Sequence, residues 1–267
     1  EAQPNEKLVY RTTDQGKPLS LWVYWPGGSK PERPLPAIVL YHGGGWTTGT
    51  PVFYLAVARH FVERGMTVVL PEYRVNESSG SRIPDSTKDA RAAMRWVKAH
   101  AGDLGIDLKR LAAGGGSAGG QLAASLGAAK VDHPDQPAID PRPEALVLFN
   151  PGVNFTYPSF AGAGLKDNPS VAGMALADLA DSDPMKNLGP GYPPCIVFHG
   201  TADQTVPFGA VKEFVEAVNA AGGSCELVPF EGAPHSFYQG QRNSANFDLA
   251  MKRADAFLTG LGLMAGQ

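Results

Sequence analysis

Short, almost wholly apolar runs alternate along the chain with longer segments in which apolar residues recur every three or four positions. The apolar runs are Ala37–Tyr41, Thr67–Leu70, Arg110–Ala113, Ala145–Phe149, Cys195–His199 and Cys225–Pro229. The segments with helical spacing are Tyr54–Arg64, Ser86–His100, Ala118–Ala129, Phe208–Ala221 and Phe247–Leu261. Continuous apolar runs are typical of strands that are buried on both faces of a parallel sheet. The alternation therefore predicts an α/β protein with a mostly parallel sheet and helices on both of its faces.

Two segments depart from this alternation. Near the start, Leu8–Thr12 and Leu19–Trp25 are β-rich and flank a turn-forming stretch, which predicts an antiparallel N-terminal hairpin. The second segment, Asn154–Gly191, is rich in Pro, Gly, Asp and Ser and contains one candidate helix, Val171–Leu179. We expect an insertion within a single domain spanning residues 1–267. Such an insertion can be a lid-like wall of a pocket, and a solvated surface loop is the equally weighted alternative.

Composition and charge exclude several classes of protein. Hydrophobic residues make up 43% of the chain and charged residues 18%, which is enough apolar material for a buried core. A net charge of −3 gives no basic surface for nucleic acid or for an anionic membrane. No apolar run approaches the roughly 20 residues that span a bilayer, so we expect a soluble protein. The first residue is not Met, which suits either a removed secretory leader or a start chosen for recombinant expression. A secreted or periplasmic location stays open, as does the oligomeric state.

A candidate nucleophile stands between a predicted strand and a predicted helix. Gly115–Gly119 matches G-x-S-x-G with Ser117 at its centre. In this context the serine occupies a sharp strand-to-helix turn, where small neighbours are needed and the hydroxyl is lifted clear of the backbone. The segment predicts the nucleophile of an α/β-hydrolase fold.

The same glycines allow a rival interpretation. Gly114, Gly116 and Gly119 also satisfy the dinucleotide fingerprint G-x-G-x-x-G. Such a fingerprint usually opens the first βαβ unit and is followed about 20 positions later by an acidic residue at a strand end. Here several strands precede it and that residue is not in place, so a nucleotide-dependent oxidoreductase is the weaker reading. A Walker phosphate loop is excluded, because Gly120 and Gln121 replace its Lys and Ser/Thr. We expect no cofactor.

Two later strand ends supply the remaining members of a catalytic triad. Asp203 lies in the loop after Cys195–His199, and His235 follows Cys225–Pro229. The chain order Ser, Asp, His is the one that this fold uses. We expect His235 to take the proton of Ser117 while the Asp203 carboxylate orients the ring. Glu231 is the alternative acid.

A glycine-rich turn after the first buried run is a candidate oxyanion hole. His42–Trp46 reads His-Gly-Gly-Gly-Trp, and glycine lets backbone N–H groups approach a reacting carbonyl closely. The N–H groups of Gly44, Gly45 and Ala118 are the best candidates to hold the oxyanion. A flexible turn is the alternative for this segment on its own.

The other titratable residues are given structural roles. We place His60, His100 and His133 on the surface and expect His42 and His199 to brace loops. Asp85 and Asp89 suit capping near the start of a helix. The sequence contains no HExxH, paired CxxC or calcium-loop pattern, so no catalytic metal is expected.

The two cysteines leave one question open. Cys195 and Cys225 both begin apolar runs that we interpret as adjacent strands. Two buried free thiols are the favoured reading, and a disulfide between neighbouring strands is the alternative.

Taken together, these motifs resemble esterases of the α/β-hydrolase fold related to hormone-sensitive lipase and to the bifunctional feruloyl and acetylxylan esterases. The matching segments are His42–Trp46, Tyr73–Arg74, Pro84–Asp85, Asp89–Ala90, Arg95–Val97, Ser117–Gly120, His199–Asp203 and His235. Two features depart from the relatives of hormone-sensitive lipase. Gly116 stands where they usually have aspartate, and the 41 residues before His42 leave little room for their N-terminal helical cap. The departures favour the capless branch that resembles carbohydrate esterases.

The resemblance implies a serine-dependent carboxylesterase of short acyl esters, among them acetyl or feruloyl esters of plant polysaccharide. The substrate would be a small molecule or would be carried on a polysaccharide. No large apolar lid is visible, which disfavours a long-chain lipase. A peptidase or lactonase with the same triad remains the nearest alternative. A binding module without activity is the alternative from another class, although the serine, the histidine and the glycines that such a module would normally have lost are all present.

Overall fold

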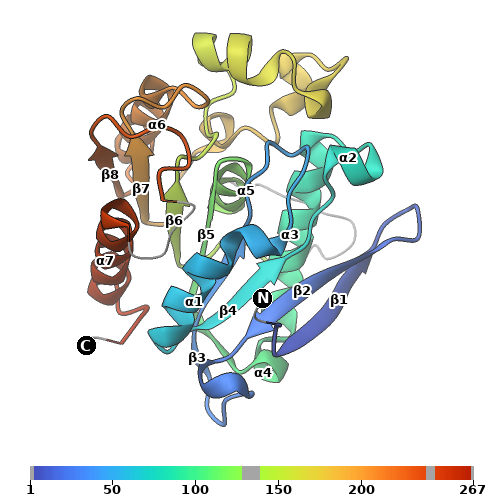
Figure 1. The fold of residues 1–267 in the computed structure, drawn as a ribbon, viewed down its shortest axis with the longest axis vertical. Helices are drawn as coiled ribbons and strands as arrows, with labels where there is room; N and C mark the ends of the chain where they lie inside the picture. Colours follow the sequence, from blue (N-terminus) through green and yellow to red (C-terminus); the bar gives the residue numbers. More distant parts are fainter. Residues whose placement is uncertain (1–2, 128–138, 239–243, 266–267) are drawn as a thin grey trace.

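The computed structural model describes residues 3–127, 139–238 and 244–265. This part of the chain contains one eight-stranded sheet in the order β1-β2-β4-β3-β5-β6-β7-β8 (Figure 1). The strands are β1 (Glu6–Thr12), β2 (Pro18–Tyr24), β3 (Leu35–Tyr41), β4 (Thr67–Pro71), β5 (Ile106–Gly116), β6 (Ala145–Phe149), β7 (Cys195–Gly200) and β8 (Cys225–Phe230). β2 pairs antiparallel with both β1 and β4, and the pairs from β4 to β8 are parallel. The predicted fold, with its N-terminal hairpin, is confirmed.

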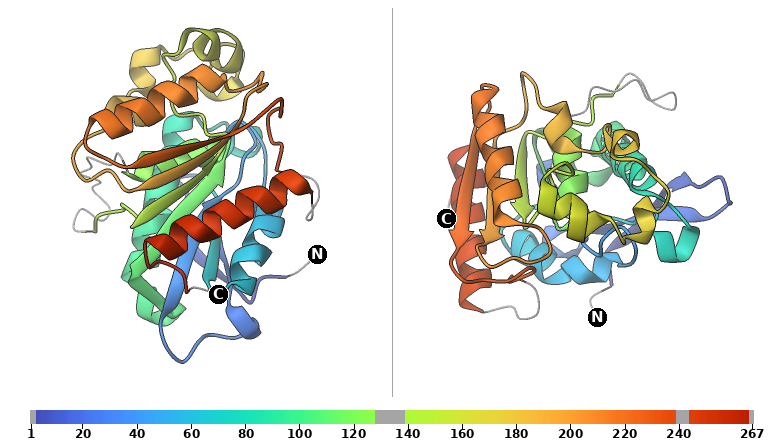
Figure 2. Two further views of the ribbon diagram at one scale, coloured as in Figure 1. Left: turned by 90° about the vertical axis from the view of Figure 1, so that its left-hand side faces the viewer. Right: turned by 90° about the horizontal axis from the view of Figure 1, so that it is seen from above.

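Helices cover both faces of the sheet, as predicted (Figure 2). The longer ones are α1 (Leu55–Glu63), α3 (Ile83–Ala99), α5 (Ala118–Gly127), α6 (Phe208–Ala220) and α7 (Ala245–Gly260), and the single-turn helices are α2 (Asn76–Ser79) and α4 (Ala101–Leu104). Apolar residues of α1 and α7 belong to one buried cluster, and those of α3, α5 and α6 belong to another on the opposite face. Both faces of the central strands are therefore covered, which is why these strands are apolar throughout.

Two predicted boundaries need comment. β5 begins at Ile106, four positions before the apolar run Arg110–Ala113 that predicted it. Residues 107–110 of this strand are partly or fully exposed, and three of them (Asp107, Lys109 and Arg110) are polar, so the extension is not part of an apolar run. The helix predicted over Ala118–Ala129 is described as far as Gly127, and its last two residues lie outside the described part.

The order of the central strands indicates where a binding site is expected. β3 lies between β4 and β5, so the chain leaves β3 toward one side of the sheet and returns to its other side. Binding sites of open α/β sheets lie beyond the carboxyl ends of the strands at such a reversal. The carboxyl ends of β3 and β5 precede His42 and Ser117, respectively. The fold therefore places the two glycine-rich motifs side by side.

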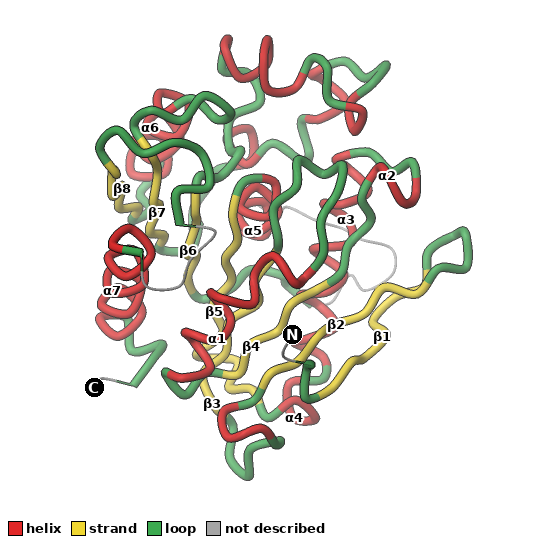
Figure 3. The backbone as a smooth tube through the Cα atoms, viewed as in Figure 1, coloured by secondary structure: helices red, strands yellow, loops and turns green. Residues whose placement is uncertain are grey.

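The segment between β6 and β7 contains no long helix. The predicted helix Val171–Leu179 is wrong: two 3₁₀ turns, Pro169–Val171 and Leu176–Leu179, lie there instead. Gly173 between them has a φ of +75°, a left-handed conformation that interrupts helical hydrogen bonding. A π-helical turn (Phe160–Leu165) and a 3₁₀ turn (Pro184–Asn187) complete the segment. Figure 3 shows these turns at the top of the molecule, separated by loops.

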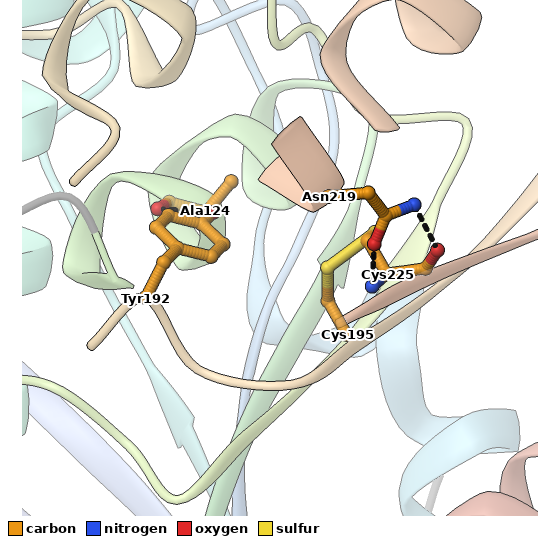
Figure 4. The surroundings of a disulfide bond; sticks show 5 residues. All are labelled: Ala124, Tyr192, Cys195, Asn219 and Cys225. Carbon is orange, nitrogen blue, oxygen red and sulfur yellow. Dashed lines mark hydrogen bonds between the residues drawn. A yellow bond between two sulfur atoms is a disulfide. The ribbon is translucent and has the colours of Figure 1, made fainter. Parts of the chain in front are cut away.

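A disulfide joins the first residues of β7 and β8 (Figure 4). Cys195 and Cys225 are partners in the parallel register, with Cα atoms 4.6 Å apart, so their side chains meet on one face of the sheet. The favoured reading of two free thiols is wrong, because the sequence could not set this register. Asn219 of α6 also binds the backbone of Cys225 at both its N–H and its carbonyl, at 2.8 and 2.9 Å. The start of the edge strand β8 is thus held both by the disulfide and by the hydrogen bonds of Asn219.

None of the described helices is both long and apolar enough to cross a membrane.

Candidate active site

Ser117 occupies the strained turn that its motif predicts. Its φ is 55°, in the left-handed region, and its N–H donates to Phe149 O of β6 at 2.9 Å. A Cβ at Gly115 would lie 2.6 Å from Tyr41 O, and one at Gly119 would collide with the same carbonyl. Only glycine fits at these two positions, because backbone rather than a movable side chain fills the space. The turn is therefore held by close contact between β3, β5 and the start of α5.

A continuous chain of hydrogen bonds links the three predicted triad residues. His235 Nε2 lies 2.9 Å from Ser117 Oγ, and His235 Nδ1 lies 2.6 Å from Asp203 Oδ2. The other carboxylate oxygen of Asp203 accepts from the N–H groups of Thr205 and Val206, both at 2.8 Å. The side chain of Asp203 is fully buried, whereas that of His235 is 18% exposed. The structure thus brings together residues from three separate strand ends.

The surroundings of Asp203 keep its side chain charged. Burial raises the pKa of this carboxyl, but the hydrogen bond and charge interaction with His235 and the hydrogen bond from Val206 outweigh it. The net result is a pKa below the ordinary value. A buried carboxylate that stays ionised can fix the tautomer of a neighbouring imidazole and stabilise its protonated form.

The glycine-rich turn after β3 leaves N–H groups without a protein acceptor. Within the described part of the chain, the N–H groups of Gly44, Gly45 and Ala118 make no hydrogen bond. Gly44 and Gly45 have φ values of 126° and 61°, and a Cβ at Gly44 would collide with Thr48 O. Donors that are oriented in this way before a ligand arrives are suited to an oxyanion.

The segment between β6 and β7 supports this turn. Asn168 Nδ2 donates to Gly45 O and Ser170 Oγ donates to Trp46 O, both at 3.0 Å. The indole N–H of Trp46 donates to Gln121 Oε1 of α5 at 2.8 Å. The turn is thus fixed to the insertion on one side and to the nucleophile's helix on the other.

The described histidines outside the triad make structural contacts. His42 Nδ1 lies 2.7 Å from Gly43 O, and His199 Nε2 lies 2.9 Å from Val206 O, so both brace loops as expected. His100 stacks on Trp96, and His133 lies outside the described residues. The surface assignment of His60 needs correction, because its side chain is only 13% exposed and lies 2.7 Å from Asp255. α1 and α7 share one face of the sheet, which the sequence pattern alone does not reveal.

The predicted acidic residues have different positions. Glu231 is exposed, and within the described residues it forms no hydrogen bond or ion pair with His235. Asp85 caps α3 as predicted, accepting from Arg82 N at 2.9 Å. Asp89 is not a cap: it is fully buried, and its two carboxylate oxygens bind the guanidinium of Arg74 at 2.7 and 2.9 Å. A helix-start argument missed this ion pair because Arg74 approaches from the loop after β4.

Sequence reasoning missed two features beside Ser117. Asn150 Nδ2 lies 3.1 Å from His235 Nε2, and its position directly after β6 was the signal available in the sequence. The hydroxyls of Tyr54 and Tyr238 lie 2.7 Å apart and fill the space into which a side chain at Gly116 would project. This pair explains why the residue before the serine is glycine here.

A cavity of about 560 Å³ lies beside the glycine-rich turn. His42, Gly49, Phe53 and Tyr73 are among its lining residues. The His42 ring stacks on that of Tyr73 with centroids 4.2 Å apart. The cavity therefore shares a wall with the turn.

Comparisons with known proteins agree with this geometry. Residues 38–239 match a family model described as alpha/beta hydrolase fold. Carboxylesterase NlhH of Mycobacterium tuberculosis is 31% identical over 99% of this chain and 83% of its own length. The apo form of Thermogutta terrifontis esterase 2 is 36% identical with a TM-score of 0.88, covering 100% of this chain and 98% of that one. Its propionate-bound structure is 35% identical with a TM-score of 0.86, over 98% and 96% of the two chains.

Proposed function

This chain belongs to the α/β-hydrolase fold family and is a carboxylic ester hydrolase, and from that premise we propose that it is a serine esterase of short-chain acyl esters. Ser117 is the nucleophile, His235 the general base and acid, and Asp203 the residue that orients His235. The backbone N–H groups of Gly44, Gly45 and Ala118 form the oxyanion hole. The observation that carries the proposal is the hydrogen-bond chain from Asp203 through His235 to Ser117, with distances of 2.6 and 2.9 Å.

The reaction follows from the position of each group. Ser117 Oγ attacks the ester carbonyl carbon while its proton moves to His235 Nε2, and the carbonyl oxygen takes the negative charge. The protonated His235 then gives this proton to the departing alkoxide, which leaves an acyl-serine. A water molecule, which gives its proton to His235, then attacks the acyl-serine in the same way. This step releases the acid and restores Ser117. Each N–H donor to the oxyanion is expected to contribute about 3 kcal/mol to the barrier reduction.

One comparison supports short acyl groups as substrates, and the net charge of the chain bears on the charge of the substrate. Esterase 2 of Thermogutta terrifontis, which is similar to this chain over nearly its whole length, has been solved with bound propionate. The net charge of −3 gives no reason to expect an anionic substrate. Acetyl or feruloyl esters of plant polysaccharide are the finer candidates, from the resemblance to carbohydrate esterases.

We infer further that the chain is one domain in which residues 154–191 form a wall of the site. The hydrogen bonds of Asn168 and Ser170 to the carbonyls of Gly45 and Trp46 support this role. Removing these bonds would loosen the turn that carries two of the proposed oxyanion donors.

The test is hydrolysis of p-nitrophenyl acetate, butyrate and octanoate, with acetate release from acetylated xylan measured in parallel. Ser117→Ala is expected to lose about a thousandfold or more in kcat, because the nucleophile is gone while the rest of the site remains. Wild-type protein should also react stoichiometrically with a fluorophosphonate probe at Ser117. Comparable activity in wild type and Ser117→Ala would remove Ser117 from its role, and octanoate hydrolysed faster than acetate would contradict the short-acyl assignment.

A further inference from the structure

Asn150 is placed between the strands that carry the nucleophile and the orienting acid. It follows β6, which lies between β5 and β7 in the sheet. Its backbone N–H donates to Phe198 O of β7 at 2.8 Å. Its side chain is fully buried and reaches His235, with Nδ2 3.1 Å from Nε2. The amide thus touches the ring nitrogen that also faces Ser117 Oγ at 2.9 Å.

Asn150 has two energetically unfavourable features. The φ of Asn150 is 36°, in the left-handed region that non-glycine residues rarely adopt. Its Oδ1 is buried without a hydrogen-bond partner among the described residues. In the described part of the chain, the Asn150 side chain makes its hydrogen bond through Nδ2, to His235. Strain and an unsatisfied carbonyl at a residue in contact with a reactive group point to a role in the reaction.

The tautomer of His235 decides which end of the amide faces it. The carboxylate of Asp203 can only accept a hydrogen bond, so His235 Nδ1 carries the proton that joins them. Nε2 of the neutral ring is therefore an acceptor, as it must be to take the proton of Ser117. The single lone pair of this nitrogen is shared between the amide N–H and the Ser117 hydroxyl, whereas an amide oxygen in the same place would oppose two lone pairs. Among the described residues, Asp203 and His199 are titratable groups that interact with this ring, and both come from the β7 side.

We propose that Asn150 is a positioning residue of the hydrolysis, whose amide N–H holds His235 Nε2 in its proton-free form facing Ser117. This inference rests on the proposed function. When Ser117 Oγ attacks, its O–H bond breaks, a C–O bond forms and the proton moves to Nε2. Nε2 then becomes a donor, so the hydrogen bond from Asn150 must be given up at that moment. The amide therefore favours the proton-free form of Nε2 before substrate arrives.

The test is the pH dependence of kcat/KM, which reports ionisations of the free enzyme. Asn150→Leu keeps the size of the side chain and removes the donor, so the acid limb should move to higher pH by about half a unit to one unit. Asn150→Asp places a second carboxylate beside Nε2, which favours the protonated ring, and should move the limb further in the same direction. A merely structural role would lower kcat in both variants and leave the acid limb in place, which would overturn the proposal. A shift to lower pH in Asn150→Leu would also overturn it, because the amide oxygen would then be the group that faces the ring.

A measurement on the wild type tests the proposal even if the variants fail to fold. In isotope-labelled protein, NMR should detect a scalar coupling across the hydrogen bond from the Asn150 side-chain amide to His235 Nε2. Absence of this coupling, with both signals observed and assigned, would overturn the proposal. Failure of the proposed function is recognised separately: it would appear as wild-type activity that survives Ser117→Ala, whereas an unmoved acid limb in a Ser117-dependent enzyme refutes the role of Asn150 alone.

Discussion

The centre and the edge of the sheet each supply half of the site, and they hold their parts differently. In the centre, β3 and β5 place the glycine-rich turn and Ser117 through close backbone contacts, such as that between Gly119 and Tyr41 O. At the edge, β7 and β8 are followed by loops in which hydrogen bonds hold Asp203 and His235. β3 is buried almost throughout, whereas β8 contains buried, partly buried and exposed residues.

The difference indicates what a substitution does in each half. A side chain added in the centre must push backbone or buried side chains aside, so its effect spreads to the position of Ser117. At the edge, a lost polar group leaves the backbone in place and removes a charge or a proton acceptor. We expect activity to be most sensitive to steric changes in the centre of the sheet and to electrostatic changes at its edge.

The largest expected effect is a loss of kcat from a substitution at the edge of the sheet. Asp203→Asn keeps the shape of the side chain but replaces the carboxylate that fixes the tautomer of His235, so kcat should fall by about 10⁴-fold. The free energy of unfolding at neutral pH, measured by urea titration, shows whether the fold is intact. A loss below tenfold would mean that the carboxylate is not needed at this position.

Next in size is removal of the disulfide. Cys195 and Cys225 are 30 positions apart, so the chain-entropy model predicts that Cys195→Ala with Cys225→Ala lowers the free energy of unfolding by about 3 to 4 kcal/mol. kcat at 25 °C should stay within a factor of two, because the bond lies at the end of the strands away from Asp203 and His235. Reduction of the wild type with dithiothreitol is the matched control. A large loss of kcat in folded protein would show that the two ends of the edge strands are coupled.

A smaller loss is expected from crowding the centre. Gly116→Ala places a Cβ against the hydroxyls of Tyr54 and Tyr238, which should cost about 3 kcal/mol in unfolding free energy. Tyr238→Phe removes one of these hydroxyls, so the double variant should recover part of the loss. Thermal unfolding and kcat of the four proteins form a double-mutant cycle. Strict additivity would contradict the steric explanation.

The smallest expected effect is a pH dependence in the centre. Burial lowers the pKa of His42 to about 4, whereas an unfolded histidine titrates near about 6.5. As the pH falls from 7 to 5, the unfolded chain binds a proton that folded His42 does not, so stability falls by about 2 kcal/mol. His42→Gln should lack this component.

The comparison with His42→Gln is needed because another buried group acts in the opposite direction. Burial raises the pKa of Asp183 to about 6, so its contribution to stability increases as the pH falls through that value. Only the difference between wild type and variant, measured by urea unfolding at both pH values, isolates His42. Equal slopes in the two proteins would show that His42 does not remain neutral when folded.

The sequence predicted the fold and the strand ends because these follow from local pattern. Continuous apolar runs identified the buried strands, and the motifs at their ends identified Ser117, Asp203 and His235, which the structure places within hydrogen-bond distance. Their catalytic roles stay predictions until activity is measured.

What the sequence could not predict depends on register and on loops from distant segments. The Cys195–Cys225 bond requires the pairing of two particular residues, and a shift of one position would send the side chains to opposite faces. Asp89 forms an ion pair with a residue outside its helix. Asn150 has no motif of its own, and its contact with His235 arises only when three strands align.

The disulfide also makes the chain between residues 195 and 225 a covalent ring that contains Asp203 and α6. A single cut by a protease inside this ring would leave both fragments joined as one molecule. Gly222 and Ser224, in the turn between α6 and β8, are exposed, so this turn is the place where such a nick, or an engineered pair of new termini, could be accommodated without separating the orienting acid from the base.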